Sequence, residues 1–89
     1  MKKYRKKPIV VEAWNNNEEW REDILKEFPG MYTGVSIVNG LYTEYLAFDI
    51  DDFETVKIYD GDWVIKDVEG NPYPCRQSVF EATYEEVEG

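Results

Sequence analysis

The sequence contains no histidine and only one cysteine, Cys75. A single thiol cannot form an intramolecular disulfide, and without histidine it cannot complete a zinc site of the usual kinds. The missing imidazole also removes the base that activates most serine and cysteine nucleophiles. We therefore expect no enzymatic activity, no metal and no cofactor, and we interpret Cys75 as a small, half-buried apolar residue.

The sequence also lacks the run of about eighteen apolar residues that a membrane-spanning helix requires. Its basic start is followed by the short mixed segment 8–14 rather than by the apolar region of a signal peptide. Together with the missing disulfide framework, these absences predict a protein without a membrane segment in a reducing, cytoplasmic setting.

Basic residues are scarce after the first few positions. The chain carries 10 Lys and Arg against 19 Asp and Glu, for a net charge of −9, and five of the basic residues lie at positions 2 to 7. The other five basic residues and all 19 acidic residues lie after position 8, so this part of the chain has a net charge of −14. Such an acidic body repels nucleic-acid phosphates, so we expect no direct binding of DNA or RNA.

The length of 89 residues allows one hydrophobic core rather than two. We expect a single domain over residues 1–89, in which residues 1–7 form a basic N-terminal arm. Three Trp, seven Tyr and four Phe supply much of the core. We interpret the tryptophans at positions 14, 20 and 63 as core or core-edge residues rather than as a cage for a ligand.

The first half of the chain predicts a strand and then a helix. Apolar residues alternate from Ile9 to Trp14, as they do in a half-buried strand. A helix is predicted over about 17–28, where apolar residues recur at helical spacing and Asn16 with Glu19 resembles a capping box. The pair Pro29-Gly30 ends this helix.

Two hairpins are predicted after the helix. Asn39-Gly40 separates the alternating segments Tyr32 to Val38 and Leu41 to Phe48, which favours a type I′ turn because both residues tolerate positive φ. A second hairpin runs from Asp60 to Cys75, where turn residues bracket alternating apolar positions. We expect Trp63, at the entrance of this hairpin, to be the nucleus of the core.

The remaining segments are less specific. Val56 to Tyr59 predicts a short strand. Residues 76–82 fit either a short helical turn capped by Ser78 or a strand, and residues 83–87 fit a final strand. The elements together predict an α+β fold, in which a curved antiparallel sheet of about five to six strands packs on one α-helix, with an optional C-terminal helical turn.

Four segments form a recognisable combination: Tyr4-Arg5-Lys6-Lys7-Pro8-Ile9-Val10-Val11-Glu12-Ala13, Gly61-Asp62-Trp63-Val64-Ile65-Lys66, Tyr73-Pro74-Cys75 and Phe80-Glu81-Ala82-Thr83-Tyr84-Glu85. This combination resembles a family of small phage and prophage proteins that is named after a Pro-Gly-Asp-Tyr-Gly motif. In this chain Tyr59-Asp60-Gly61-Asp62-Trp63 stands in place of that motif, and residues 31–53 match no motif of the family. The resemblance implies a phage or prophage origin and action inside a bacterial cell, and it implies no reaction.

Two groups of residues are candidates for binding a ligand or partner. One combines basic and aromatic side chains, which bind phosphate and stack on bases: Tyr4, Arg5, Lys7, Trp63, Tyr73 and Arg76. The basic arm could equally pair with the acidic surface of the protein itself, and both interpretations stay open.

The other group forms an acidic surface: Glu18, Glu22, Asp49, Asp51, Asp52 and Glu54. These carboxylates could imitate the phosphates of DNA. The four between positions 49 and 54 also resemble a cluster for a hard cation, but they lack the glycine and the distal glutamate of a calcium loop. We therefore interpret this segment as a solvated acidic loop.

Three hypotheses for the function follow. The first is a non-catalytic binding module, derived from a phage or prophage, that grips a host or phage protein, with a homodimer through an exposed sheet edge as one form. The second is an acidic DNA mimic that inhibits a nucleic-acid-binding defence enzyme of the host. The third is a sponge that holds a small nucleotide signal with basic and aromatic residues. We take the first as the working hypothesis because it requires the least chemistry from the sequence.

Overall fold

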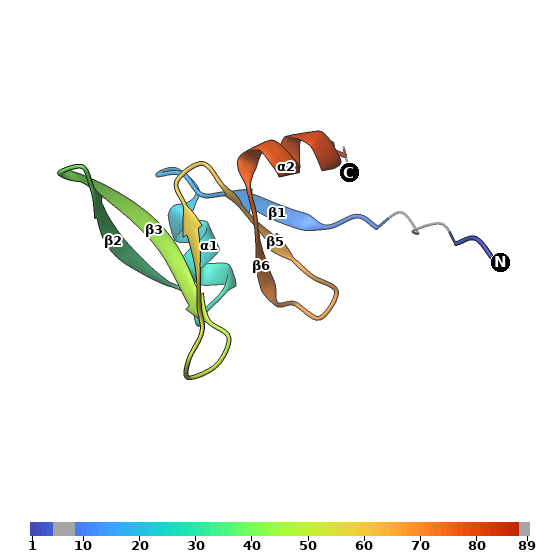
Figure 1. Ribbon diagram of the computed structural model, residues 1–89, viewed down its shortest axis with the longest axis horizontal. Coiled ribbons are helices and arrows are strands. Elements are labelled where there is room, and N and C mark those ends of the chain that lie inside the picture. Colours follow the sequence, from blue (N-terminus) through green and yellow to red (C-terminus); the bar gives the residue numbers. More distant parts are fainter. Residues whose placement is uncertain (5–8, 88–89) are drawn as a thin grey trace.

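The computed structural model of the protein describes residues 1–4 and 9–87. This part of the chain forms six strands and two short helices (Figure 1). In chain order they are β1 (Glu12–Asn15), α1 (Arg21–Glu27), β2 (Tyr32–Val38), β3 (Leu41–Asp49), β4 (Thr55–Tyr59), β5 (Trp63–Lys66), β6 (Pro72–Cys75) and α2 (Gln77–Thr83). The predicted α+β class is confirmed.

The strands form two antiparallel sheets of three strands, so the prediction of one curved sheet on one helix was wrong. One sheet has the order β1-β5-β6, and the other has the order β2-β3-β4. The six strands separate into two sheets because β1 pairs with β5, which is far away in the sequence; Trp14, for example, lies opposite Val64. The local pattern of a strand does not specify a partner at that distance, because pairing depends on the tertiary context.

The two sheets and α1 enclose one hydrophobic core. Ile24, on the buried side of α1, is fully buried, and Phe28 follows directly after the helix. Trp14 packs edge-to-face on Phe28 with 5.4 Å between the ring centroids. The buried core residues come from α1, from the segment after it and from both sheets: Ile24, Phe28, Met31, Leu46, Ile58 and Val64.

The helix α1 begins at Arg21, later than the predicted start near residue 17. The predicted capping box was wrong because the side chain of Asn16 is buried and donates to the Ile58 carbonyl at 2.8 Å. Asn17 instead accepts the backbone N–H of Trp20 at 2.9 Å, in the turn that precedes the helix. Trp20 was predicted as a core or core-edge residue. It is 40% exposed and therefore does not belong to the core.

The hairpin at Asn39-Gly40 is confirmed. Both residues have positive φ, 52° and 79°, and Val38 lies opposite Leu41, which gives the predicted two-residue turn. The first strand is shorter than predicted: it covers Glu12–Asn15 rather than residues 9–14.

The C-terminal segment is a helix, and residues 84–87 do not form the strand that was one of the options. The backbone N–H of Gln77 donates to the Asp62 carboxylate at 3.1 Å, so Asp62 rather than Ser78 caps α2. The ring of Phe80 on this helix stacks on Trp63, with 3.8 Å between centroids and 10° between planes. Trp63 is therefore half-buried at the edge of the domain, and Val64 is the β5 residue in the main core.

Candidate functional site

The hairpin of β2 and β3 extends beyond the rest of its sheet. β4 pairs with β3 only at residues 45–49, so residues 35–44 form a two-stranded projection (Figure 1). We call residues 35–44 the apolar ribbon. Along the described chain, the outer edge of β2 pairs with no other strand.

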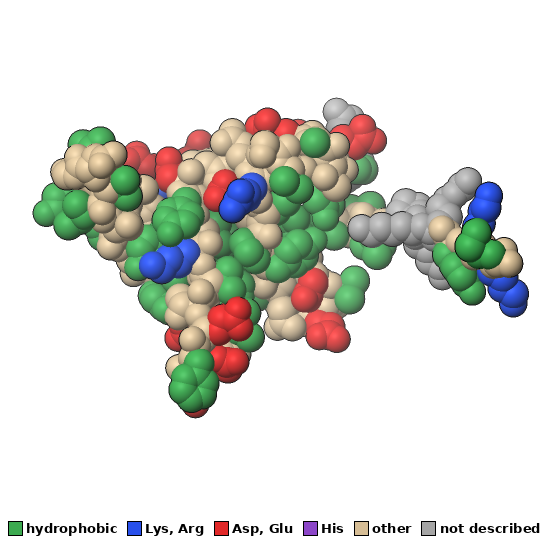
Figure 2. All heavy atoms as spheres, viewed as in Figure 1, with side chains coloured by type: hydrophobic (Ala, Val, Ile, Leu, Met, Phe, Trp, Pro, Cys, Tyr) green, Lys and Arg blue, Asp and Glu red, His purple; other side chains and the backbone are tan. Residues whose placement is uncertain are grey.

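The apolar ribbon exposes an unusual number of large hydrophobic side chains. They gather at one end of the molecule (Figure 2), and their exposed fractions are 56% for Val35, 63% for Ile37, 57% for Val38, 71% for Leu41 and 77% for Tyr42. Single exposed apolar residues are ordinary on protein surfaces, whereas a contiguous group of them indicates an interaction site.

One face of the ribbon continues the core-facing side of its sheet. Residues opposite one another on antiparallel strands share a face, and the register places Val35 opposite Glu44 and Ile37 opposite Tyr42. Because residues two apart on a strand also share a face, these side chains lie on the same side as Leu46, which is buried in the core. The apolar face that packs at Leu46 thus extends into solvent along the ribbon.

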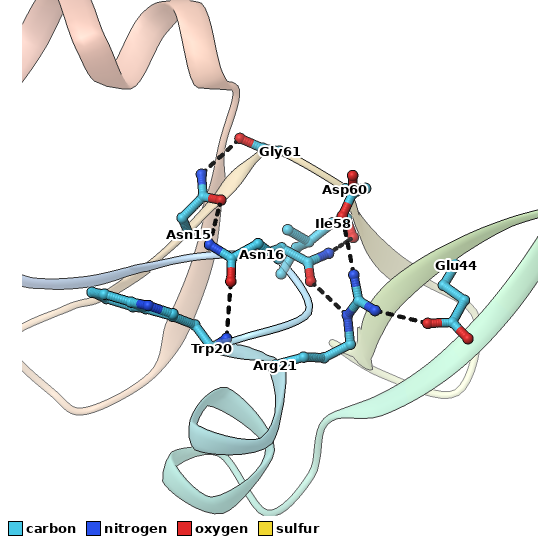
Figure 3. A network of polar contacts seen from close by, with 9 residues as sticks. Asn15, Asn16, Trp20, Arg21, Glu44, Ile58, Asp60 and Gly61 are labelled. Carbon is cyan, nitrogen blue, oxygen red and sulfur yellow. Dashed lines mark hydrogen bonds and ion pairs between the residues drawn. The ribbon is translucent and has the colours of Figure 1, made fainter.

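The base of the ribbon is fixed by a network of polar contacts (Figure 3). The side chain of Arg21 donates to Glu44 at 2.7 Å, to Asp60 at 3.1 Å and to the Asn16 amide oxygen at 3.0 Å. The Arg21 side chain is 13% exposed, whereas those of Glu44 and Asp60 are 60% and 62% exposed, so only the bond to Asn16 is shielded from solvent. One guanidinium therefore joins β3 to the turn after β4 and to the segment after β1.

The opposite face of the ribbon's base is covered by the ring of Tyr45. A methyl group at Gly34 would overlap this ring, so glycine is required at that position. Lys57 lies 4.8 Å above the centroid of the same ring, and Tyr59 packs beside it at 6.0 Å. These contacts and the Arg21 network link the base of the ribbon to β4 and to the segment after β1.

Four members of the predicted group of basic and aromatic residues lie within the described part of the chain: Tyr4, Trp63, Tyr73 and Arg76. Arg5 and Lys7 lie outside the described residues, and Tyr4 is 90% exposed. Trp63 and Tyr73 lie in an aromatic cluster with α2, in which the Tyr73 hydroxyl is 3.1 Å from that of Tyr84. That hydrogen bond, with a smaller effect of burial, raises the pKa of Tyr73 to about 12.

Arg76 lies between β6 and α2. It precedes α2 and borders an open depression that is otherwise lined by Asp62, Gln77, Ser78 and Glu81. Neither Trp63 nor Tyr73 lines this depression. The deep basic and aromatic pocket that a nucleotide sponge needs is therefore not formed by the described members of the group.

Two members of the acidic group stabilise the connection from β3 to β4. The Asp49 carboxylate accepts hydrogen bonds from the hydroxyls of Tyr32 and Thr55 at 2.9 and 2.8 Å, and the bond from Tyr32 raises the pKa of that tyrosine. Asp51 accepts the backbone N–H groups of residues 53 and 54. All six members of the group are exposed, Asp49 and Asp51 included; the other four are Glu18, Glu22, Asp52 and Glu54.

Acidic side chains lie in separate groups over the face that Figure 2 shows. Within the ranges that the structure describes, no three His, Cys, Asp or Glu side chains are arranged to hold a metal ion. Cys75 is half-buried as predicted, and burial, with a smaller effect of the nearby Asp62 charge, raises the pKa of its thiol.

The analysis of the sequence missed the ribbon as a candidate site, although a signal was present. Residues 28–43 contain no charged side chain, in a chain of which 33% of the residues are charged. The alternating pattern of this segment predicts a hairpin, but alternation alone does not show whether a second layer covers its apolar face.

Neither of the two helices in the described chain is long and apolar enough to span a membrane. Comparisons of the chain with protein-family models, with curated proteins and with solved structures found no match.

Proposed function

We propose that this protein is a non-catalytic binding module that contacts another protein through its apolar ribbon. The observation that carries the proposal is the ribbon itself: a projection with a fixed base, exposed apolar side chains and no charge between residues 28 and 43. The resemblance to the family of small phage and prophage proteins adds to this proposal a phage or prophage origin and action on a host or phage protein in the bacterial cytoplasm.

The exposed area of the ribbon is sufficient for a specific complex only when a second kind of contact contributes. Covering the exposed parts of five large apolar side chains releases on the order of 5–8 kcal/mol. This range only approaches the roughly 8 kcal/mol of a micromolar complex, and association also costs several kcal/mol of lost freedom. Side-chain burial alone therefore gives a weak complex.

The free edge of β2 supplies the second contact. Alternate residues of an edge strand direct their N–H and C=O groups away from the sheet, where an added strand can pair with them. This mode of recognition uses backbone hydrogen bonds for affinity and alternate side chains for specificity. The ribbon offers both on the same segment, Tyr32–Val38.

The other two hypotheses draw less support from the described residues. A DNA mimic needs a continuous ridge of free carboxylates, whereas Asp49 and Asp51 accept hydrogen bonds within the β3–β4 connection. A nucleotide sponge needs a free aromatic ring beside basic groups, whereas Trp63 is already stacked on Phe80. Both remain predictions from the sequence.

The proposal is tested by affinity purification with three tagged baits, the wild-type chain, Ile37→Lys and Phe53→Lys, from a lysate of bacteria that also express the untagged wild-type chain. Ile37 is 63% exposed on the ribbon, and Phe53 is 98% exposed in the acidic loop, so both changes place a lysine on an exposed apolar position. We expect wild type and Phe53→Lys to retain the same partner and Ile37→Lys to lose it, with thermal melting showing that all three baits fold. Retention of the partner by folded Ile37→Lys would refute the proposal.

A further inference from the structure

We infer that the partner at the edge of β2 is a second copy of this chain, bound by antiparallel pairing of the two β2 strands about Val35. This inference rests on the proposed function and names the partner. The pairing joins the two β2-β3-β4 sheets into one continuous sheet of six strands with two-fold symmetry.

The first argument is that only one of the four sheet edges is open to pairing. Natural sheets protect their edges with charged side chains, proline or bulges. In the described chain, β1 carries Glu12, β4 carries Lys57, and β6 carries both Pro72 and Pro74. β2 carries none of these, and its register against β3 runs over seven consecutive pairs without a bulge.

The second argument is electrostatic. Two copies that each carry a net charge of −9 repel one another, so a contact between them is favoured where charge is absent. The longest uncharged segment of the chain, residues 28–43, contains the whole of β2 and the turn of the hairpin. The first charge beyond it, on Glu44, is paired with Arg21 at 2.7 Å. A basic partner, in contrast, would be attracted to the acidic body rather than to this neutral segment.

The third argument is that the strand complements itself. Val35 is the central residue of Tyr32–Val38, so pairing about it uses the full length of the strand. In that register Val35 faces its own copy, Ile37 faces Thr33, and Val38 faces Tyr32 of the second copy. These pairs are β-branched or aromatic, which favours cross-strand contact, and none brings like charges together.

The same register also places the tip of each ribbon beside the base of the other. Thr33 lies opposite Leu46 within one copy, at the base where the sheet meets the core. Placing Ile37 beside Thr33 of the other copy therefore brings the apolar tip of one ribbon next to the base of the other. Val35, Ile37 and Val38 on β2 then gain neighbours across the seam, whereas Leu41 and Tyr42 on β3 keep the surroundings that they have in the single chain.

The test places a charged residue at Val35, the position that faces its own copy in the proposed dimer. Val35 is 56% exposed and lies outside the core, so we expect both Val35→Lys and Val35→Glu to fold; because Val35 lies opposite Glu44, the glutamate variant is expected to be the less stable of the two, and thermal melting measures this difference. We expect purified wild type to sediment as a dimer and each variant alone to sediment as a monomer, with at least a tenfold weaker self-association, because like charges meet at the centre. Mixed in equal amounts, the two variants are expected to form a dimer again, since Lys then faces Glu.

The mixing experiment separates loss of the interface from loss of the fold, because a misfolded variant does not regain a partner. Phe53→Lys serves as the control and is expected to remain a dimer. A wild type that is monomeric at every concentration that stays in solution, or a mixture that stays monomeric, overturns the inference. If the wild type is monomeric while Ile37→Lys still loses a partner from lysate, the dimer is refuted and the proposed function stands; if Ile37→Lys keeps that partner, the proposed function fails as well.

Discussion

Asn16 offers the sharpest test of how the two sheets are held together. Its side chain is fully buried, donates to the Ile58 carbonyl at 2.8 Å and accepts from the Arg21 guanidinium at 3.0 Å. Its backbone bonds to Asp62 and Gly61 as well, so this one residue contacts α1, β4 and the turn between β4 and β5 (Figure 3). Replacing it by alanine removes both side-chain bonds and leaves the backbone unchanged.

The expected loss follows from those two bonds. Each contributes about 0.5–1.5 kcal/mol net, and a buried carbonyl left without its partner costs a further ~1–3 kcal/mol. We therefore expect Asn16→Ala to lower the free energy of unfolding by about 3 kcal/mol, a large part of the roughly 5–15 kcal/mol of a small domain. For a chain of this length that corresponds to a fall in Tm of about 15 °C.

The assay is urea denaturation followed by tryptophan fluorescence, with all variants at one protein concentration. Asn17→Ala is the matched control: it is the neighbouring asparagine, and its side chain also makes two hydrogen bonds, accepting the backbone N–H of Trp20 and donating to the Asn15 side chain, but it is not fully buried. We expect this control to lose about 1 kcal/mol, as for a capping residue. A loss for Asn16→Ala no greater than that of Asn17→Ala would refute the structural role assigned to Asn16.

Three further predictions concern the aromatic cluster and the thiol. Trp63→Ala should cost about 2 kcal/mol in urea denaturation, less than a core tryptophan, because the ring is half-buried and loses mainly its stacking on Phe80. Cys75 should react with iodoacetamide more slowly at neutral pH than an ordinary exposed thiol, because burial raises its pKa and lowers the thiolate fraction. Tyr84→Phe should lower the pKa of Tyr73 from about 12, as followed by NMR, because the hydrogen bond between the two hydroxyls is its main cause.

Each of these three predictions can be contradicted by a specific result. A cost near 4 kcal/mol for Trp63→Ala would place that ring in the main core. Equal reaction rates of Cys75 and of a cysteine introduced at exposed position 53 would contradict the effect of burial. Since the folded pKa of Tyr73 lies above its usual value of 10.0, its contribution to stability is complete below pH 10 and is lost between pH 10 and about 12. An unchanged Tyr73 pKa in Tyr84→Phe would contradict the assigned cause.

Features that depend on local conformation could be predicted from the sequence. Asn39-Gly40 specified a two-residue turn because both positions need positive φ, and the strands on either side of it followed. The helix start could not be predicted in the same way. Asn16 has the chemistry of a cap, but its amide bonds to the Ile58 carbonyl, 42 residues away, and only the tertiary structure creates that partner.

The candidate site was accessible to sequence analysis only in part. The hairpin itself was predicted, but its exposure depends on where β4 ends, and β4 covers only residues 45–49 of β3. Trp63 was expected in the core because tryptophan is large and apolar, whereas the neighbouring Val64 takes that place. Which face of β5 meets the core follows from the packing of α1 and α2 on opposite faces, and neither helix's position follows from a local pattern.

The central claim is that the free edge of β2 pairs with a second copy of this chain. Amide hydrogen exchange, measured residue by residue on dilute and on concentrated protein, tests this claim most directly. We predict that amides within Tyr32–Val38 exchange markedly more slowly in the concentrated sample, while those of the opposite edge, Thr55–Tyr59, exchange at the same rate in both. Equal rates for β2 at both concentrations, or slowing at β4 instead, would contradict the claim.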